Sequence, residues 1–286
     1  METSSARSRV ILVDQVVIRP IGDSATLRAL EEVQRRIWGG PDSEVVPAHQ
    51  LRAVAAAGGV VLGAFAPGGE VIGFSYGFLG RREGRLFLHS HMTGVVEEWR
   101  GREVGFRLKR AQRQEALARG LELIVWTFDP LQSVNASFNL HRLGAEARRY
   151  HVNYYGEMND ALNRGVESDR LEVDWHLTAP RVVRLMEADA PPPAARLAEG
   201  PVALAARGGP LPRPGDPVLD HDAPQVRLGI PPDFTALRRT DLALAREWRA
   251  VSRRVFQAYF DRGYAAVDFV RTAGGGEYVL RRSDAD

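Results

Sequence analysis

Proline and glycine divide this chain of 286 residues into parts of different composition. Between Ala188 and Pro224 they form the runs Pro191-Pro192-Pro193, Gly208-Gly209-Pro210 and Pro212-Arg213-Pro214-Gly215. Such a stretch holds neither a long helix nor a central strand, because proline lacks a backbone donor and both residues break regular structure. We therefore expect a first domain over residues 1–187, a linker or wrapping arm over residues 188–224, and a smaller α/β subdomain over residues 225–286.

Composition excludes several classes of protein. With 44% hydrophobic and 26% charged residues the chain is expected to be globular. The absence of cysteine excludes a disulfide scaffold, a cysteine nucleophile and a thiolate metal site. A net charge of +2 gives no broad basic surface for nucleic acid. The longest weakly polar run, Ala53 to Pro67, is glycine-interrupted and shorter than the roughly 20 residues of a membrane span. We expect a cytoplasmic protein without a membrane or nucleic-acid partner.

The first domain mixes strand and helix patterns. Apolar runs predict strands at residues 16–19, 60–66, 71–78, 86–96, 123–128 and 171–177. Capping and glycine stop signals predict helices at residues 24–38, 103–119 and 135–143. Pro67-Gly68-Gly69 joins two of the strands as a hairpin turn, which favours antiparallel pairing.

The subdomain after the arm is expected to read strand, helix, strand, strand, at residues 226–230, 241–262, 264–270 and 277–280. Its helix carries an apolar stripe that includes Leu244, Trp248 and Val255. About 60 residues form a marginal core by themselves, so this unit is expected to extend or cap the main sheet. A homodimer built partly through it, with exchange of the arm, would also cover the stripe.

The segment Arg100-Gly101-Arg102-Glu103-Val104-Gly105-Phe106 lies between a predicted strand and a predicted helix. A strand that passes through a glycine-containing loop into a helix presents unpaired N–H groups and the positive end of the helix dipole. This arrangement suits a diphosphate, although a plain tight turn uses the same residues.

In this context the chain resembles the GNAT family of acyl-CoA-dependent N-acyltransferases. The family's loop, Gln/Arg-x-x-Gly-x-Gly/Ala, falls on Arg100, Glu103 and Gly105, and its Asn-headed helix ending in Leu-Gly falls on Asn135 through Gly144. The resemblance covers about residues 10–177. It implies an α/β (α+β) fold with a mixed, mostly antiparallel central sheet flanked by helices.

Further stretches resemble one branch of the family, which has an extra C-terminal segment and is often found beside N-acylamino-acid racemases. These stretches are Ser90-His91-Met92, Trp126-Thr127-Phe128-Asp129-Pro130-Leu131 and Asn153-Tyr154-Tyr155-Gly156. The branch implies transfer of an acetyl or succinyl group from acyl-CoA, without a metal, to the amine of a small molecule such as an amino acid.

The resemblance also implies which residues contact acyl-CoA. Pantetheine would lie along the backbone of the long strand near Thr93, Val95 and Val96, and Asn135 faces the cofactor or caps its own helix. The diphosphate would lie against Arg100, Gly101, Arg102, Glu103, Val104, Gly105 and Phe106.

Two residues depart from the family pattern. Glu103 stands where the family has glycine, and its carboxylate would repel a diphosphate if it pointed inward. Leu140 stands where the family has a tyrosine that protonates the departing thiolate. A non-catalytic acyl-CoA-binding or assembly module is therefore the alternative function.

Three side chains are the candidates for catalysis. His91, two residues from His89 on one strand face, would act through a water as the base that deprotonates the acceptor amine. Asp129 would recognise an ammonium group, and Tyr150, Tyr154 or a water would replace the missing tyrosine. The alternative interpretations are that the histidines are packing residues, that Asp129 is a turn or cap carboxylate, and that Tyr150 lines an acceptor pocket or a dimer surface.

Overall fold

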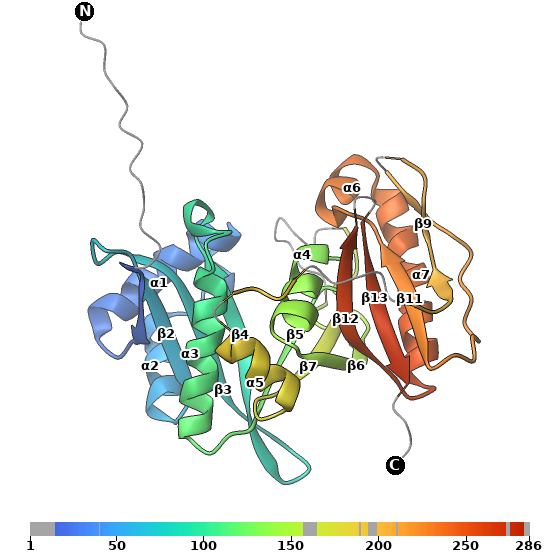
Figure 1. The fold of residues 1–286 in the computed structure, drawn as a ribbon. Helices are drawn as coiled ribbons and strands as arrows, with labels where there is room; N and C mark the ends of the chain where they lie inside the picture. The colour runs from blue at the N-terminus through green and yellow to red at the C-terminus, as the bar shows by residue number, and fades with distance from the viewer. Residues whose placement is uncertain are drawn as a thin grey trace, which may run out of the picture.

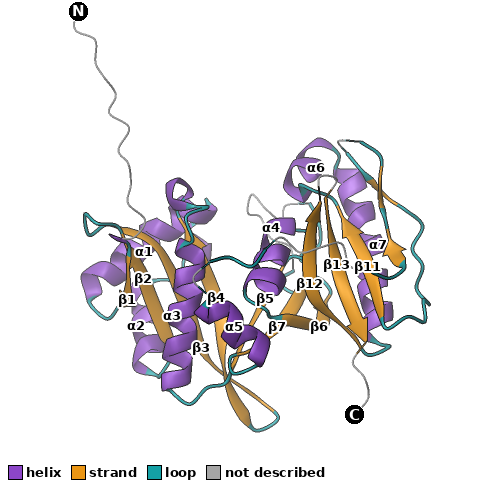
Figure 2. Cartoon of the chain, in the orientation of Figure 1, coloured by secondary structure: helices purple, strands orange, loops and turns teal. Residues whose placement is uncertain are grey.

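A computed structural model describes residues 15–39, 41–156, 165–188, 190–193, 199–209, 211–272 and 275–282. In this part of the chain one sheet of 11 strands has the order β1-β2-β3-β4-β5-β7-β6-β12-β13-β11-β8. Neighbouring strands are antiparallel except at β4/β5 and β11/β8. The mixed, mostly antiparallel sheet flanked by helices that we expected is thus confirmed (Figures 1 and 2).

The strands of this sheet are β1 Val17–Pro20, β2 Val60–Phe65, β3 Val71–Arg82, β4 Arg85–Val95, β5 Leu123–Phe128, β6 Glu146–His151, β7 Arg170–His176, β8 Val202–Leu204, β11 Gln225–Ile230, β12 Tyr264–Thr272 and β13 Gly275–Arg282. A separate short pair consists of β9 Ala206–Arg207 and β10 Arg213–Pro214. The α-helices are α1 Ser24–Trp38, α2 Ala48–Ala56, α3 Val104–Ala118, α4 Ser133–Ala136, α5 Pro180–Glu187, α6 Phe234–Thr240 and α7 Leu242–Phe260. Asp42–Glu44 and Glu97–Trp99 form 3-10 turns, and α4 continues as a π-helical segment, Ser137–Arg142.

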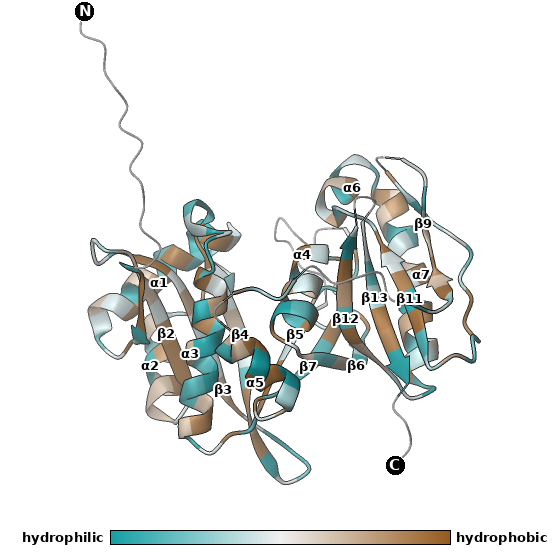
Figure 3. Cartoon of the chain, viewed as in Figure 1, coloured by the Kyte–Doolittle hydropathy of each residue, from teal (hydrophilic) through white to brown (hydrophobic). Residues whose placement is uncertain are grey.

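Helices α1 and α3 cover opposite faces of the first half of the sheet. The ring of Phe74 on β3 meets Trp38 of α1 edge-on, with centroids 5.8 Å apart. The next residue, Ser75, accepts a hydrogen bond from Gln112 of α3 at 2.8 Å. Since successive strand residues point to opposite faces, the sheet here is the middle layer of three. Figure 3 shows the hydrophobic colour concentrated on the strands.

The C-terminal unit extends the main sheet, as the sequence predicted. Ala147 of β6 pairs with Ala266 of β12, and β13, β11 and β8 follow outward. The arm folds onto its own subdomain, where Trp248 of α7 donates to the Pro212 carbonyl at 2.7 Å. The apolar stripe of α7 is therefore covered within the chain, since Trp248 and Val255 are 0% exposed. The need for a second subunit to cover it disappears, and the homodimer stays a prediction.

Seven of the strands and α-helices were not predicted from the sequence: α2, α5, α6, β6 and the three short strands of the arm, β8, β9 and β10. Helix α2 begins after Pro47 without a side-chain cap, and β6 carries polar residues on most positions. Helices α5 and α6 are short, at eight and seven residues. No helix in the described ranges is long and apolar enough to cross a bilayer.

Candidate functional site

The two parallel strands β4 and β5 pair over only a short distance. Leu88 pairs with Ile124 and His89 with Val125, and the described part of the chain shows no later pair between them. We call the facing edges beyond these pairs the fork. Backbone donors and acceptors need partners, so the fork edges are suited to a ligand with amide groups.

His91 lies in a β-bulge at the start of the fork. On the β3 side Met92 pairs with Tyr76 and Ser90 pairs with Gly77, which leaves His91 between them without a cross-strand partner. A bulge bends the strand and takes backbone groups out of the ladder, as is common next to active sites. Sequence alternation indicates no bulge here.

The first turn of α3 has the geometry of an anion site. Glu103 precedes the helix with φ 57°, and no side chain caps this end in the described structure. The N–H groups of Val104, Gly105 and Phe106 are among the first of the helix, where intrahelical partners are lacking. A Cβ built on Gly105 would find only Phe138 Cζ, at 4.0 Å. The backbone of this turn is thus open on the Gly105 side.

Arg100 and Arg102, the two arginines of the loop before α3, make different contacts. Arg100 donates through Nε to the Val95 carbonyl at 3.1 Å and through Nη2 to the Ile37 carbonyl at 3.4 Å. Arg102 lies over the Trp99 ring, 5.5 Å from its centroid. Arg100 therefore holds the loop to β4 and α1, and it occupies the Val95 carbonyl that we expected to be free for pantetheine.

Two other predicted cofactor contacts also have partners. The Val96 N–H donates to the Ile72 carbonyl at 2.9 Å, and the Thr93 hydroxyl lies 3.0 Å from the Ser75 hydroxyl. Asn135 is exposed on α4. Leu140, at the position of the family tyrosine, is fully buried and provides no proton donor.

A buried lysine lies beneath the closed end of the fork. Lys109 of α3 donates to Ser90 Oγ at 3.0 Å and to Gln112 Oε1 at 2.9 Å, and its Nζ is 3.7 Å from the centroid of Trp126. Burial lowers the pKa of Lys109 to about 7. Lys109 was not among the site residues predicted from the sequence. The available signal was the only lysine of the chain, one turn after Phe106 on the buried face of its helix.

His89 and His91 lie on the opposite face of the sheet from Lys109. Their rings contact Phe78 at centroid distances of 5.0 and 5.8 Å, and His91 also meets Tyr76 edge-on. Desolvation lowers the pKa of both histidines. At neutral pH both imidazoles are therefore neutral and able to accept a proton.

The same face carries polar groups that were not predicted from the sequence. Thr127 of β5 lies opposite Glu172 of β7, and its hydroxyl is 3.1 Å from that of Tyr155. Glu172 is 2.8 Å from His151 Nε2 and also pairs with Arg149. These groups come from three strands and the turn after β6, so only the folded sheet brings them beside His89.

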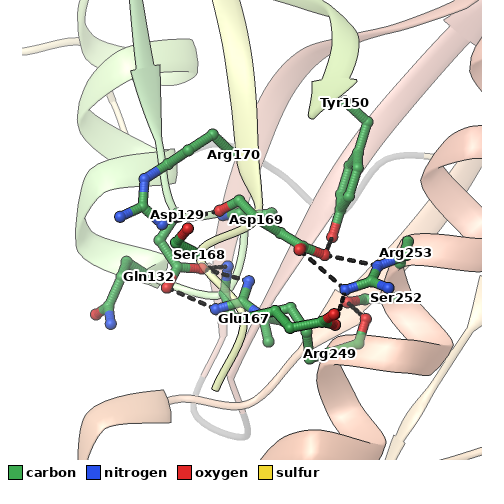
Figure 4. A network of polar contacts seen from close by, with 12 residues as sticks. Asp129, Gln132, Tyr150, Glu167, Ser168, Asp169, Arg170, Arg249, Ser252 and Arg253 are labelled. Atoms are coloured by element: carbon green, nitrogen blue, oxygen red, sulfur yellow. Dashed lines mark hydrogen bonds and ion pairs between the residues drawn. The ribbon is translucent and has the colours of Figure 1, made fainter. Parts of the chain in front are cut away.

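Asp129 belongs to the joint between the two halves of the sheet (Figure 4). Arg249 of α7 contacts its two oxygens at 2.7 and 2.8 Å, and the Leu131 N–H donates to Oδ1 at 2.9 Å. An acceptor ammonium would have to compete with a buried guanidinium. This geometry favours a structural role over the predicted recognition of an amine.

Tyr150 lies in the same network, away from the fork. It is on β6, two strands from β5, and its hydroxyl donates to Asp169 Oδ2 at 2.6 Å. Asp169 also pairs with Arg253 of α7 at 2.8 Å. Burial, reinforced by Asp169, raises the pKa of Tyr150 well above its usual value. The position and the partner of this hydroxyl disfavour the predicted role as proton donor to a thiolate.

Comparison with solved structures finds acetyltransferases. The chain is similar to YncA, a putative acetyltransferase from Salmonella typhimurium with acetyl-CoA, at 19% identity and TM-score 0.47, over 62% of this chain and 98% of that one. A GNAT-superfamily phosphinothricin acetyltransferase from Sinorhizobium meliloti matches at 20% identity and TM-score 0.45, over 56% and 87%. No protein-family model and no curated protein matches the sequence. The assignment of chemistry therefore depends on the geometry of the site.

Proposed function

We propose that the chain is an N-acyltransferase that moves an acetyl or succinyl group from acyl-CoA to the amine of a small molecule in a ternary complex. One observation carries the proposal: the fork, the bulge at His91 and the uncapped start of α3 follow one another along the chain. They provide in sequence an amide edge, a displaced backbone segment and an anion site.

Acyl-CoA would lie along this path. Its diphosphate would accept hydrogen bonds from the N–H groups of Val104, Gly105 and Phe106, where the helix dipole favours negative charge. Its pantetheine would pair with the β4 edge near Thr93, with Asn135 of α4 as a further contact. From Val95 to Ser90 the strand spans roughly 17 Å, which is comparable to an extended pantetheine arm. The thioester would then lie near His91.

The chemistry requires a base and an oxyanion donor. His91, neutral at physiological pH, would take a proton from the acceptor ammonium through a water. The amine nitrogen then forms a bond to the thioester carbon, a backbone N–H freed by the bulge stabilises the oxyanion, and the C–S bond breaks. The nitrogen loses its second proton as the C–S bond breaks, and this proton passes through water to the departing thiolate, which leaves without a tyrosine since thiols have pKa values of about 8.5.

We propose an amino acid as the acceptor. The support is the resemblance to the branch found beside N-acylamino-acid racemases, together with the polar face formed by Thr127, Tyr155, His151 and Glu172. Both ends of a zwitterion would find groups of opposite charge on that face, provided that they exchange with the present partners of Glu172, which are Arg82, Arg149 and His151.

Release of free thiol tests the proposal. The full chain would be mixed with acetyl-CoA or succinyl-CoA and a panel of L- and D-amino acids, and thiol would be measured with a colorimetric reagent. Release that depends on one amino acid supports the transferase. Calorimetric binding of CoA without any acceptor-dependent release would support the alternative, an acyl-CoA-binding module, which the buried Leu140 favours.

A further inference from the structure

Arg142 lies beside the first turn of α3, and two of its hydrogen-bond donors have no partner in the described part of the chain. It ends the π-helical segment after α4, and its guanidinium carbon is 3.5 Å from the centroid of Phe106. The side chain is 12% exposed, and its Nε and Nη1 are buried with no hydrogen-bond partner among the described residues. Buried donors without partners are costly and uncommon, so this pair of atoms calls for an explanation.

The remaining donor of Arg142 holds a residue in a strained conformation. Nη2 donates to Glu103 Oε2 at 2.6 Å. Glu103 has φ 57°, in the left-handed region that residues other than glycine seldom occupy. Its side chain does not cap the helix it precedes. The left-handed backbone of Glu103 thus accompanies a side chain whose carboxylate contacts Arg142 and not the helix N-terminus.

The two partners differ in their freedom to move. Glu103 is 50% exposed, so its carboxylate can turn into water at little cost. Arg142 is packed on Phe106 and cannot leave its position without losing that contact. An anion that binds at the first turn of α3 would repel the Glu103 carboxylate and present oxygens to the guanidinium. Arginine is suited to this exchange because its planar guanidinium group can form paired hydrogen bonds to a carboxylate and to a phosphate in the same way.

We infer that Arg142 binds the diphosphate of acyl-CoA and that Glu103 occupies Arg142 until the diphosphate displaces it. This inference rests on the proposed function for the identity of the ligand. It assigns diphosphate binding to Arg142 and makes Glu103 the group that the diphosphate displaces, which explains why a carboxylate is tolerated at an anion site.

Binding of CoA and of pantetheine to matched variants tests the inference by calorimetry. Arg142→Met keeps the stem packed on Phe106 and should weaken CoA binding at least tenfold, because charge-assisted hydrogen bonds are lost. Pantetheine, which lacks the diphosphate, should bind this variant as it binds the natural protein. Glu103→Gln should tighten CoA binding severalfold, and this gain should vanish in the double variant. Arg119→Met and Glu115→Gln, which break the ion pair at the C-terminal end of α3, are the controls and should leave both affinities within twofold.

Equal CoA binding by Arg142→Met, or equal weakening of CoA and pantetheine, would overturn the inference in favour of a structural role. If the natural protein binds no CoA, the proposed function fails, and inorganic pyrophosphate then tests Arg142 separately. Weaker pyrophosphate binding by Arg142→Met would still support an anion-binding arginine, whereas unchanged binding would refute it. Thermal melts establish that each variant is folded.

Discussion

Arg249 of α7 and Asp129, which follows β5, lie 120 residues apart in sequence and form two charged hydrogen bonds of 2.7 and 2.8 Å. Both side chains are buried, at 3% and 9% exposure. Burial alone raises the pKa of Asp129, but the charge and hydrogen bonds of Arg249 outweigh it and hold this pKa below its usual value. The C-terminal unit is thus joined to the first domain by charge as well as by the continuous sheet.

Arg249→Met is expected to destabilise the fold by about 3–5 kcal/mol, because it leaves the Asp129 carboxylate buried without its partner. The double variant with Asp129→Asn should recover part of this loss. Urea denaturation measures both values. Arg35→Met, which breaks the exposed pair with Asp42, is the control and should cost about 0–1 kcal/mol. Equal small losses in Arg249→Met and Arg35→Met would contradict a structural role for the buried pair.

Substitutions at Gly105 are expected to weaken acyl-CoA binding without lowering the stability of the fold. Alanine has no close neighbour there and is a better helix former than glycine, so Gly105→Ala should leave the melting temperature equal or higher. The added methyl group would hinder close approach of a diphosphate, and Gly105→Val should abolish acyl-CoA binding. Calorimetry with CoA and thermal melts measure the two effects. Unchanged CoA affinity in Gly105→Val would reject the proposed diphosphate position.

His91→Ala should lower turnover about 10²–10⁴-fold with little change in acyl-CoA affinity, because a general base acts on the acceptor and not on the cofactor. Desolvation lowers the pKa of His91, so kcat/KM should fall on acidification only below the usual histidine range. Steady-state kinetics over a pH series measure both properties. His176→Ala is the control, because His176 is an exposed histidine at the C-terminal end of β7. Full turnover by His91→Ala would show that a group other than His91 acts as the base.

Lys109 is expected to make the free energy of unfolding depend on pH between neutral and alkaline values. Its pKa is lowered from 10.5 to about 7 by burial, so between these values the unfolded chain binds a proton that the native protein does not. Stability should therefore rise with pH in this window, with a slope of up to about 1.4 kcal/mol per pH unit. Urea denaturation of the natural protein and of Lys109→Met at several pH values isolates this contribution. Parallel curves for the two proteins would show that Lys109 titrates normally.

Removal of residues 188–286 is expected to cause aggregation or loss of activity, because it uncovers the β6 edge and the buried Asp129. Light scattering of the truncated and full chains measures the first effect, and the same measurement on the full chain tests the predicted homodimer. A monodisperse, fully active truncation would show that the C-terminal unit has no structural role.

Local sequence signals were sufficient where one residue fixes the backbone. The sequence offers Asp23 or Ser24 as the cap of α1 and a glycine stop at its end; Asp23 accepts the Thr26 N–H at 2.8 Å, and Gly39 ends the helix with φ 61°. Helix α2 and strand β6 escaped prediction because they lack such signals. Their positions depend on what packs against them, with Leu51 buried in α2 and Ala147 paired on both sides of β6.

The sequence by itself indicated most strands and helices of the first domain in their order, without α2, β6 and α5, together with the glycine-containing loop at the start of α3 and the apolar stripe of α7, because each depends on neighbours a few residues apart. Only the tertiary structure decided which groups share the site. The bulge at His91, the buried amine of Lys109 and the pairs Glu103–Arg142 and Asp129–Arg249 all join residues from different strands and helices. Such contacts arise from strand register and from the packing of helices on the sheet, which no local pattern encodes.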